Sequence, residues 1–357
     1  MSDLIDKQKP TKVLVIKTSS LGDVIHTLPA LTDAQNAIKG IEFDWVVEKG
    51  FSEIASWHPA VKKIIPVQIR KWRKNIFQTM GSEEWKDFKS EIKSEAYDAI
   101  IDAQGLLKSA VLAPLANGPR YGLDKNSARE PLSSWFYQHK IPVAKNQHAV
   151  ERTRQLFAQA LGYELPTTSG DYGIKSRFKS NQDSPYVVFL HGTTWDTKHY
   201  PEAYWAELIK IATNQGFKVK LLWGNTDEHG RAARLSEVSK QAELMPKMNL
   251  ESIANLLCGA HGAIAVDTGL GHLAASVDCP TLSLFSSTNP GLSGAYGRGQ
   301  KHILSTYDCS PCMKRTCTIE PVNDTETPNA NNIFPACFSA LKPEKVWKNF
   351  MDLQLML

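Results

Sequence analysis

The chain has 357 residues and a formal net charge of +4, and 42% of its residues are hydrophobic. This length exceeds one ordinary hydrophobic core and predicts two domains of roughly 150–200 residues each. The small net charge gives no indication of a nucleic-acid-binding protein. The N-terminal residues have no signal-peptide pattern, and no window approaches the roughly 18 apolar residues that span a membrane. We therefore expect a soluble, cytoplasmic protein.

In the first half, short apolar runs alternate with longer amphipathic segments, the pattern of βα units on a parallel sheet. Strands are predicted at 12–17, 43–47, 64–67 and 99–102. A helix is expected after the first strand, with Val24, Leu28, Leu31 and Ile38 on one face. Pro29 lies within it and predicts a kink or a lost hydrogen bond. A second helix is predicted at 149–161.

The pattern lapses at 167–184, a polar segment with two glycines before Pro185, which is typical of an interdomain linker. Apolar runs at 186–190, 218–222, 263–266 and 281–285 again predict strands followed by helices. The sequence therefore predicts an α/β protein with two Rossmann-like, doubly wound domains, 1–175 and 185–357. Two such domains facing each other would leave a ligand-binding cleft at the carboxyl ends of their strands. The last helix is placed in the second domain or packed back on the first.

The loop after the first predicted strand is Ser19-Ser20-Leu21-Gly22-Asp23. It lacks the Gly-x-Gly-x-x-Gly run expected of a dehydrogenase. Asp23 would lie where the first helix begins. Position alone favours an N-cap for Asp23, and the functional alternative is a general base held at the cleft.

A loop in the second half, Asp267-Thr268-Gly269-Leu270-Gly271-His272, follows an apolar strand and opens a helix. Its glycines and the helix N-terminus suit a phosphate group. Asp267 is better suited to a sugar hydroxyl, and His272 can donate to a phosphate or to a leaving group. The alternative is a capped helix with a structural histidine.

Two further loops at strand ends of the second half carry polar groups. Thr193, Thr194 and Lys198 follow the strand at 186–190 and are natural phosphate partners. Asp227 or Glu228, after the strand at 218–222, could hold a ribose or could be a first-turn acid of a helix. Three such loops in one domain predict a nucleotide-sugar site.

Basic residues gather in the first half, away from those loops. They are Arg70, Lys71, Arg73 and Lys74 around Trp72, together with Arg129. A basic run is usually a solvated face. Its position in the half that would bind the acceptor favours an anionic acceptor, and no motif of a nucleic-acid binder accompanies it.

Four of the six cysteines, Cys309, Cys312, Cys317 and Cys337, have the spacing C-x2-C-x4-C-x19-C. This spacing resembles a structural zinc site, but its middle interval is loose. A reducing compartment would keep the cysteines as thiols. We expect no bound metal and leave zinc as the alternative.

Three segments together resemble the heptosyltransferases of lipopolysaccharide inner-core synthesis, glycosyltransferase family 9. They are 15–33 with Thr18-Ser19-Ser20-Leu21-Gly22-Asp23, 101–106 with Asp102-Ala103-Gln104-Gly105, and 266–272. The resemblance runs from about Lys12 to the C-terminus. The Thr-Ser-Ser and Asp-Ala-Gln-Gly forms are closer to the first enzyme of that series, whereas the cysteine segment is closer to the second.

The resemblance implies a GT-B fold and an inverting, metal-independent glycosyltransferase without a cofactor. The donor would be ADP-heptose, carrying L-glycero-D-manno-heptose, and the acceptor a Kdo residue of Kdo2-lipid A. We expect a monomer that binds no nucleic acid and is peripheral on the cytoplasmic face of the inner membrane, where a lipid acceptor would lie. The alternatives are an enzyme acting on the first core heptose, like the second of the series, and a nucleotide-sugar-binding protein without transferase activity.

The resemblance also implies roles for individual residues. Asp23 becomes the catalytic base, and Lys198 the catalytic cation at the diphosphate. The implied donor-site residues are Thr193, Thr194, Lys198, Glu228, Met248, Asp267, Thr268, Gly269 and His272. The implied acceptor-site residues are Ser20, Gly22, Arg70, Lys71, Arg73, Lys74, Gln104 and Arg129.

Overall fold

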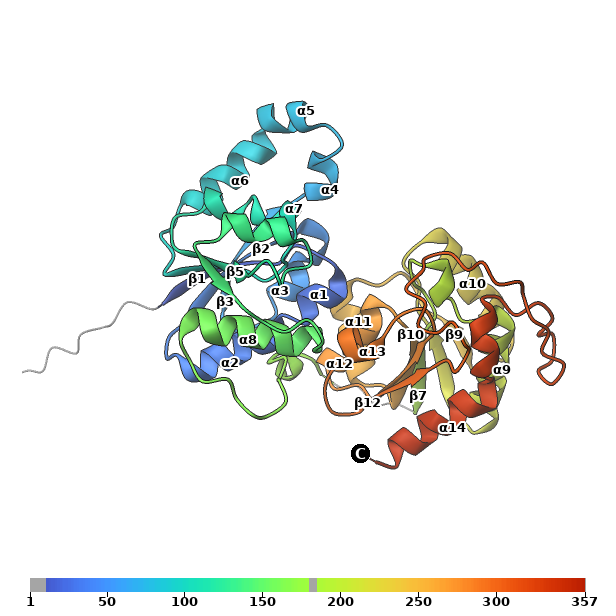
Figure 1. Ribbon diagram of the computed structural model, residues 1–357. Coiled ribbons are helices and arrows are strands. Elements are labelled where there is room, and N and C mark those ends of the chain that lie inside the picture. The colour runs from blue at the N-terminus through green and yellow to red at the C-terminus, as the bar shows by residue number, and fades with distance from the viewer. Residues whose placement is uncertain (1–10, 180–184, 357) are drawn as a thin grey trace, which may run out of the picture. The chain divides into compact units, whose positions relative to one another are not determined.

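The computed structural model describes residues 11–179 and 185–356, so that 180–184 of the predicted linker lie outside the described residues. The chain divides into two compact units, Met1–Gly173 and Ile174–Leu357. Each unit is an α/β fold built on its own parallel sheet (Figure 1).

The sheet of the first unit has the strand order β3-β2-β1-β4-β5-β6. Its strands are β1 (Lys12–Ile16), β2 (Glu42–Glu48), β3 (Val61–Val67), β4 (Ala99–Asp102), β5 (Arg120–Leu123) and β6 (His139–Ile141). Its helices are α1 (Leu21–Ile25), α2 (Leu28–Ala37), α3 (Ser52–Ala55), α4 (Ile69–Trp72), α5 (Ile76–Gly81), α6 (Glu83–Lys93), α7 (Leu107–Ala110) and α8 (Ala149–Leu161).

The sheet of the second unit has the order β12-β11-β10-β7-β8-β9. Its strands are β7 (Tyr186–Leu190), β8 (Lys218–Leu221), β9 (Ala242–Leu244), β10 (Gly262–Val266), β11 (Thr281–Phe285) and β12 (Gln300–Leu304). Its helices are α9 (Glu202–Asn214), α10 (Thr226–Ser236), α11 (Leu250–Cys258), α12 (Gly269–Ser276), α13 (Pro290–Ser293) and α14 (Pro343–Gln354).

The two sheets have the same topology when each is numbered from its own first strand. The order is then 3-2-1-4-5-6 in both, the doubly wound arrangement of Rossmann-type folds. The strand order reverses between β1 and β4 in the first unit and between β7 and β10 in the second. Ligands of such sheets bind beyond the carboxyl ends of the strands at this reversal. The topology therefore marks one candidate site in each unit.

The strands predicted from apolar runs are all present, and the missed strands lie toward the sheet edges. In β1, β4, β7, β10 and β11, at and near the sheet centres, every residue except Lys12 is buried, which explains their continuous apolar sequences. The missed strands are β5, β6, β9 and β12. Three of these, β6, β9 and β12, are edge strands, and all four missed strands carry polar, partly exposed residues. An apolar-run criterion cannot detect such strands.

The helix expected after the first strand is two helices, and the predicted kink at Pro29 is wrong. The chain leaves the helical pattern at His26 and Thr27, between α1 and α2. Pro29 then occupies the first turn of α2. A proline in the first turn costs no helical hydrogen bond, because the N–H it lacks would have had no partner there.

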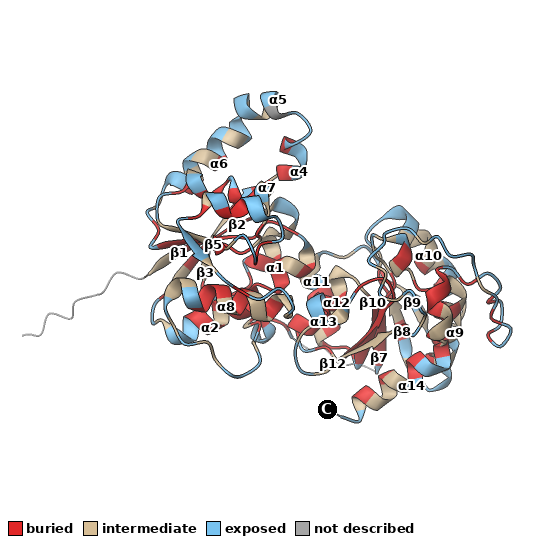
Figure 2. Ribbon diagram, viewed as in Figure 1, coloured by how far each residue is buried: buried red, intermediate tan, exposed pale blue. Residues whose placement is uncertain are grey.

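Each unit has a hydrophobic core of its own (Figure 2). The helix α14 contacts α9 and β11 of the second unit, and its buried Trp347 and Phe350 belong to that core. In the first unit, α8 packs on α2 through a buried ion pair in which Arg154 Nε lies 2.6 Å from Asp33 Oδ2. This pair fixes α8 beside the β1 and β4 loops.

Candidate active site

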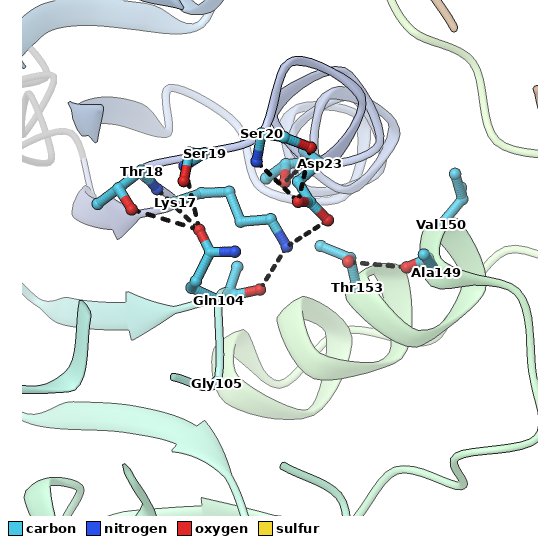
Figure 3. Close-up of polar contacts among 12 residues, drawn as sticks. Lys17, Thr18, Ser19, Ser20, Asp23, Gln104, Gly105, Ala149, Val150 and Thr153 are labelled. Atoms are coloured by element: carbon cyan, nitrogen blue, oxygen red, sulfur yellow. Dashed lines mark hydrogen bonds and ion pairs between the residues drawn. The ribbon is translucent and has the colours of Figure 1, made fainter. Parts of the chain in front are cut away.

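In the first unit, the loops after β1 and β4 meet at the reversal of strand order. The two strands are paired, with Ile16 opposite Asp102 at their carboxyl ends. Gln104 Oε1 accepts hydrogen bonds from the backbone N–H groups of Thr18 (3.0 Å) and Ser19 (3.2 Å) (Figure 3). The Gln104 side chain therefore holds the first loop in place.

Asp23 is a first-turn residue of α1, and its prediction as an N-cap is wrong. The N-cap is Ser20, and Asp23 stands at the third helical position. The Ser20 N–H donates to Asp23 Oδ2 at 2.7 Å, so that the carboxylate caps the helix from inside its first turn. Its side chain keeps 42% of its surface exposed. One oxygen is therefore fixed by the backbone while the carboxylate stays accessible.

Lys17, at the end of β1, is a part of the site that the sequence prediction missed. Its Nζ donates to the Ala103 carbonyl oxygen at 2.8 Å and lies 4.0 Å from Asp23 Oδ1 (Figure 3). Burial lowers the pKa of Lys17, and the nearby Asp23 carboxylate opposes that shift. A lysine directly after an apolar strand, beside a polar loop, was the available signal.

A cavity of about 180 Å³ opens at this point of the first unit. Lys17, Asp23, Gln104, Arg129 and Arg152 are among its lining residues. Arg152, from α8, was also missed, because it lies within a helical pattern. Its Nη2 donates to the Ser127 carbonyl at 2.6 Å, and burial lowers its pKa. The cavity thus combines one carboxylate with several cationic groups.

A buried carboxylate, Asp102, supports the loop that carries Gln104. Asp102 Oδ1 accepts from the Gln104 N–H at 2.8 Å, and Oδ2 accepts from the hydroxyls of Tyr137 (2.7 Å) and Ser109 (2.9 Å). Burial raises the pKa of Asp102, and these hydrogen bonds oppose that rise. Asp102 is a positioning residue for the Asp-Ala-Gln-Gly loop.

The predicted basic cluster lies on and just after α4. Arg70, Lys71, Arg73 and Lys74 are exposed, whereas Trp72 is buried. Lys71 is paired with Glu84, with Nζ 2.8 Å from Oε1, and this leaves the three other side chains as the more available cations.

Lys108, on α7, connects that cluster to the Asp23 loop. Its Nζ donates to Ser19 Oγ at 2.6 Å. Burial lowers the pKa of Lys108, the Asp23 carboxylate raises it, and the nearby Arg70 and Arg73 lower it further. Arg73 and Lys108 line one cavity, so the cationic cluster extends to the residue that contacts the loop of Asp23.

In the second unit, the loops after β7 and β10 also meet at the reversal of strand order. Lys198 Nζ lies 2.6 Å from Asp267 Oδ2, and the two side chains are 15% and 11% exposed. Thr288 donates to the same oxygen at 2.6 Å, and Thr193 Oγ1 donates to the Asp267 backbone carbonyl at 3.0 Å. The predicted residues Thr193, Lys198 and Asp267 are thus in direct contact.

Of the other predicted donor-site residues, Thr268, Gly269 and His272 follow Asp267 at the start of α12, whereas Met248 lines a separate cavity. Thr268 is the N-cap of α12, Gly269 is its first residue, and His272 is 8% exposed one turn later. Thr194 is exposed in the loop after β7. Met248 follows β9 and lines a polar cavity of about 620 Å³ with Lys220 and Ser252.

Glu228, and not Asp227, approaches the loop after β7. Its Oε2 accepts from the Gly224 N–H at 2.7 Å in the first turn of α10. A Cβ at Gly192 would lie 2.7 Å from Glu228 Oε1, so the glycine is what allows the carboxylate this position. Asp227 is exposed. Of the two candidates for a ribose, Glu228 therefore has the better placement.

The cysteine segment shows no metal centre. Within residues 11–179 and 185–356, no three His, Cys, Asp or Glu side chains are arranged to hold a metal ion. Cys309, Cys312, Cys317 and Cys337 are free thiols. Burial raises the pKa of Cys337 to about 11, and the three other thiols are close enough to contribute to that rise.

Two Rossmann-type units, each with polar loops at its switch point, are the architecture of nucleotide-sugar-dependent glycosyltransferases with a GT-B fold. Comparison with known proteins gives the family within that class. The family model "Glycosyltransferase family 9 (heptosyltransferase)" matches residues 85–323. The chain is 56% identical over 339 residues to lipopolysaccharide heptosyltransferase 1 of Pseudomonas aeruginosa, covering 94% of this chain and 96% of that protein.

Solved structures agree with the sequence comparison. E. coli heptosyltransferase WaaC, solved with ADP, superposes with a TM-score of 0.83 at 45% identity and covers 96% of this chain and 100% of its own. The same enzyme has been solved with ADP-2-deoxy-2-fluoro heptose. Lipopolysaccharide heptosyltransferase 2 of Salmonella typhimurium is 22% identical, over 78% of this chain and 84% of that protein.

The chain belongs to glycosyltransferase family 9, the heptosyltransferases. It is a glycosyltransferase that transfers heptose in the synthesis of the lipopolysaccharide core. The resemblance to the first enzyme of the series, which the Thr-Ser-Ser and Asp-Ala-Gln-Gly motifs indicated, is confirmed.

Proposed function

We propose that the protein transfers L-glycero-D-manno-heptose from ADP-heptose to a Kdo residue of Kdo2-lipid A, with inversion at the anomeric carbon and without a metal ion. The observation that carries the proposal is Asp23. Its carboxylate lies at the switch point of the first sheet, 42% exposed, with Oδ2 fixed by the Ser20 N–H at 2.7 Å. It lines a cavity together with Arg129 and Gln104.

The proposed reaction is a single displacement. A Kdo hydroxyl attacks the anomeric carbon of the heptose, and Asp23 accepts the hydroxyl proton as the new bond forms. ADP leaves from the opposite face and carries away the electron pair of the broken C–O bond. Help of this kind from a general base is worth roughly 10²–10⁴-fold.

Donor binding is assigned to the second unit, within the predicted domain 185–357. The negative charge that develops on the leaving diphosphate is met by Lys198, the hydroxyls of Thr193 and Thr194, and the N–H groups at the start of α12. Glu228 holds the ribose, and Asp267 a sugar hydroxyl. His272 and Met248 complete the donor site.

Acceptor binding is assigned to the first unit, within the predicted domain 1–175. The carboxylates and phosphates of Kdo2-lipid A are anionic. The exposed cations that can pair with them are Arg129, Arg70, Arg73 and Lys74. Lys71 joins them when it exchanges Glu84 for the acceptor. Ser20, Gly22 and Gln104 shape the loop where the attacking hydroxyl binds. The protein acts as a monomer, peripheral on the cytoplasmic face of the inner membrane.

The test is ADP release from ADP-heptose by the purified protein, with and without Kdo2-lipid A and in the presence of EDTA. The proposal expects release that depends on the acceptor and is unchanged by EDTA. Release only with an acceptor that already carries the first heptose would overturn the Kdo assignment. ADP binding without release for any core acceptor would overturn the transferase mechanism at Asp23.

A further inference from the structure

The first unit carries a second, larger cavity, an open groove of about 630 Å³ beside the Asp23 site. Its walls come from four short helices, α4, α5, α6 and α7. The apolar lining residues include Ile69, Trp72, Met80, Trp85, Leu107 and Val111. Ile69 and Trp72 are buried at its floor, and Figure 2 shows the exposed α5 near the buried part of α4.

The outer edge of the groove exposes large apolar side chains. Met80 is 61% exposed and Val111 45% exposed, and both line the groove. Phe77 precedes Met80 by one turn of α5 and is 91% exposed. Apolar side chains that gather in this way on a folded surface mark an interaction site, whereas single ones need no explanation.

The rim of this groove is cationic. Arg73 and Lys108 line it, and Arg70 and Lys74 are exposed on and just after α4. The acidic lining residue, Glu130, accepts the backbone N–H of Leu107 at 2.7 Å, so its charge is partly satisfied at the start of α7. Exposed apolar groups surrounded by Arg and Lys suit the surface of an anionic bilayer, whose headgroups are negatively charged and whose interior is apolar.

The groove is continuous with the site of Asp23. Leu106 lines both cavities. Lys108, a lining residue of the groove, donates to Ser19 Oγ at 2.6 Å, one residue before the loop position that fixes Asp23. A surface bound at the groove would therefore lie next to the place where the acceptor hydroxyl must be presented.

We propose that this groove and its basic rim form the surface by which the protein docks on an anionic lipid bilayer. The inference rests on the proposed function, because an acceptor that is itself a lipid has to be reached at a bilayer. Among the described residues no helix is long and apolar enough to cross a membrane, so this docking is interfacial. Phe77 and Met80 insert among the headgroups, and the rim cations, which the proposed function also assigns to the anionic acceptor, attract the lipid phosphates around it.

The test is cosedimentation of the full chain with vesicles of phosphatidylcholine alone or mixed with phosphatidylglycerol. Binding is expected to the anionic vesicles and to weaken with salt. The double variant Phe77→Ser, Met80→Ser should reduce this binding by about tenfold or more, because two apolar side chains are no longer transferred from water into the bilayer. The matched control is Leu355→Ser, Met356→Ser in the second unit, whose side chains are 86% and 73% exposed.

Activity separates this inference from the proposed function. With a deacylated, water-soluble Kdo acceptor, the Phe77/Met80 variant should keep the turnover of the unaltered protein. With vesicle-embedded acceptor, its rate at low protein concentration should fall in proportion to the lost binding. Equal vesicle binding by both double variants, or capture of a second copy of the chain in place of vesicles, would overturn the docking surface. If the unaltered protein turned over neither acceptor, the proposed function would be overturned instead.

Discussion

Each unit carries an aspartate at the switch point of the same sheet topology, Asp23 in the first and Asp267 in the second, and these two carboxylates are held differently. Asp23 is 42% exposed and lies 4.0 Å from Lys17, with one oxygen bound by a backbone N–H. Asp267 is 11% exposed, and its Oδ2 is bound by Lys198 and Thr288, both at 2.6 Å. The sheet topology thus determines where each carboxylate lies, and the neighbouring side chains determine how exposed it is.

This difference suits two chemical roles. A general base must reach the proton that it accepts, and a carboxylate with 42% of its surface exposed can do so. A carboxylate that is paired and nearly buried is suited to fixed binding, because its charge is already balanced. In the proposed donor site, the pairing would also allow an acid to lie near an anionic diphosphate without repelling it.

The largest effect is expected from Asp23→Asn. The amide keeps an oxygen for the Ser20 N–H but cannot accept the hydroxyl proton, so turnover should fall by roughly 10²–10⁴-fold. ADP affinity, measured by calorimetry, should stay within about twofold. Thermal unfolding provides the control for the helix cap. Turnover near that of the unaltered protein would rule out Asp23 as the base.

A smaller effect is expected from breaking the ion pair in the second unit. Lys198→Met removes the cation proposed to contact the diphosphate and leaves Asp267 with Thr288 but without its ion-pair partner, so ADP affinity should fall roughly 10–100-fold. Asp267→Asn keeps Lys198 and should weaken ADP binding much less. If both variants bound ADP as tightly as the unaltered protein, this pair would have no role in the donor site. Asp23→Asn, by contrast, should lose turnover and keep its ADP affinity.

Sequence reasoning could predict the two sheets because their central strands are buried on both faces and their apolar residues therefore run without interruption. It placed β4, β7 and β11 at the residue bounds that the structure has. It missed β6 and β9, three-residue edge strands whose neighbours along the sheet determine them more than their own sequences do. It joined α1 to α2, because a two-residue break does not disturb a helical apolar pattern.

The site was predictable to the extent that its residues lie in loops after strands. Asp23, Thr193 and Asp267 were singled out in this way, since parallel strands present their carboxyl ends at one edge. Gln104 was implied only by the resemblance to the heptosyltransferases. Lys17 and Arg152 were not found. Lys17 belongs to the end of an apolar strand and Arg152 to an amphipathic helix, and only the packing of α8 beside the β1 loop makes them part of one cavity.

The third prediction concerns a property that the two units share. His58 in the first unit and His191 in the second are buried, and burial lowers the pKa of each to about 4. Between pH 6.5 and pH 4 the unfolded chain binds protons that the folded protein excludes. The stabilisation that each neutral histidine contributes should therefore be complete above pH 6.5. Below pH 6.5, the free energy of unfolding should fall by up to about 1.4 kcal/mol per pH unit for each histidine.

The geometry of His58 makes this testable in one unit at a time. His58 Nδ1 accepts the Ala60 N–H at 3.2 Å, and Nε2 lies 3.0 Å from Thr32 Oγ1, so a second ring proton would have to displace the Ala60 bond. His58→Gln should flatten the pH dependence of hydrogen exchange in the first unit and leave that of the second unchanged. The exposed His139, replaced in the same way, is the control. An unaltered pH dependence in His58→Gln would mean that other groups, and not this buried imidazole, set the acid sensitivity of the first unit.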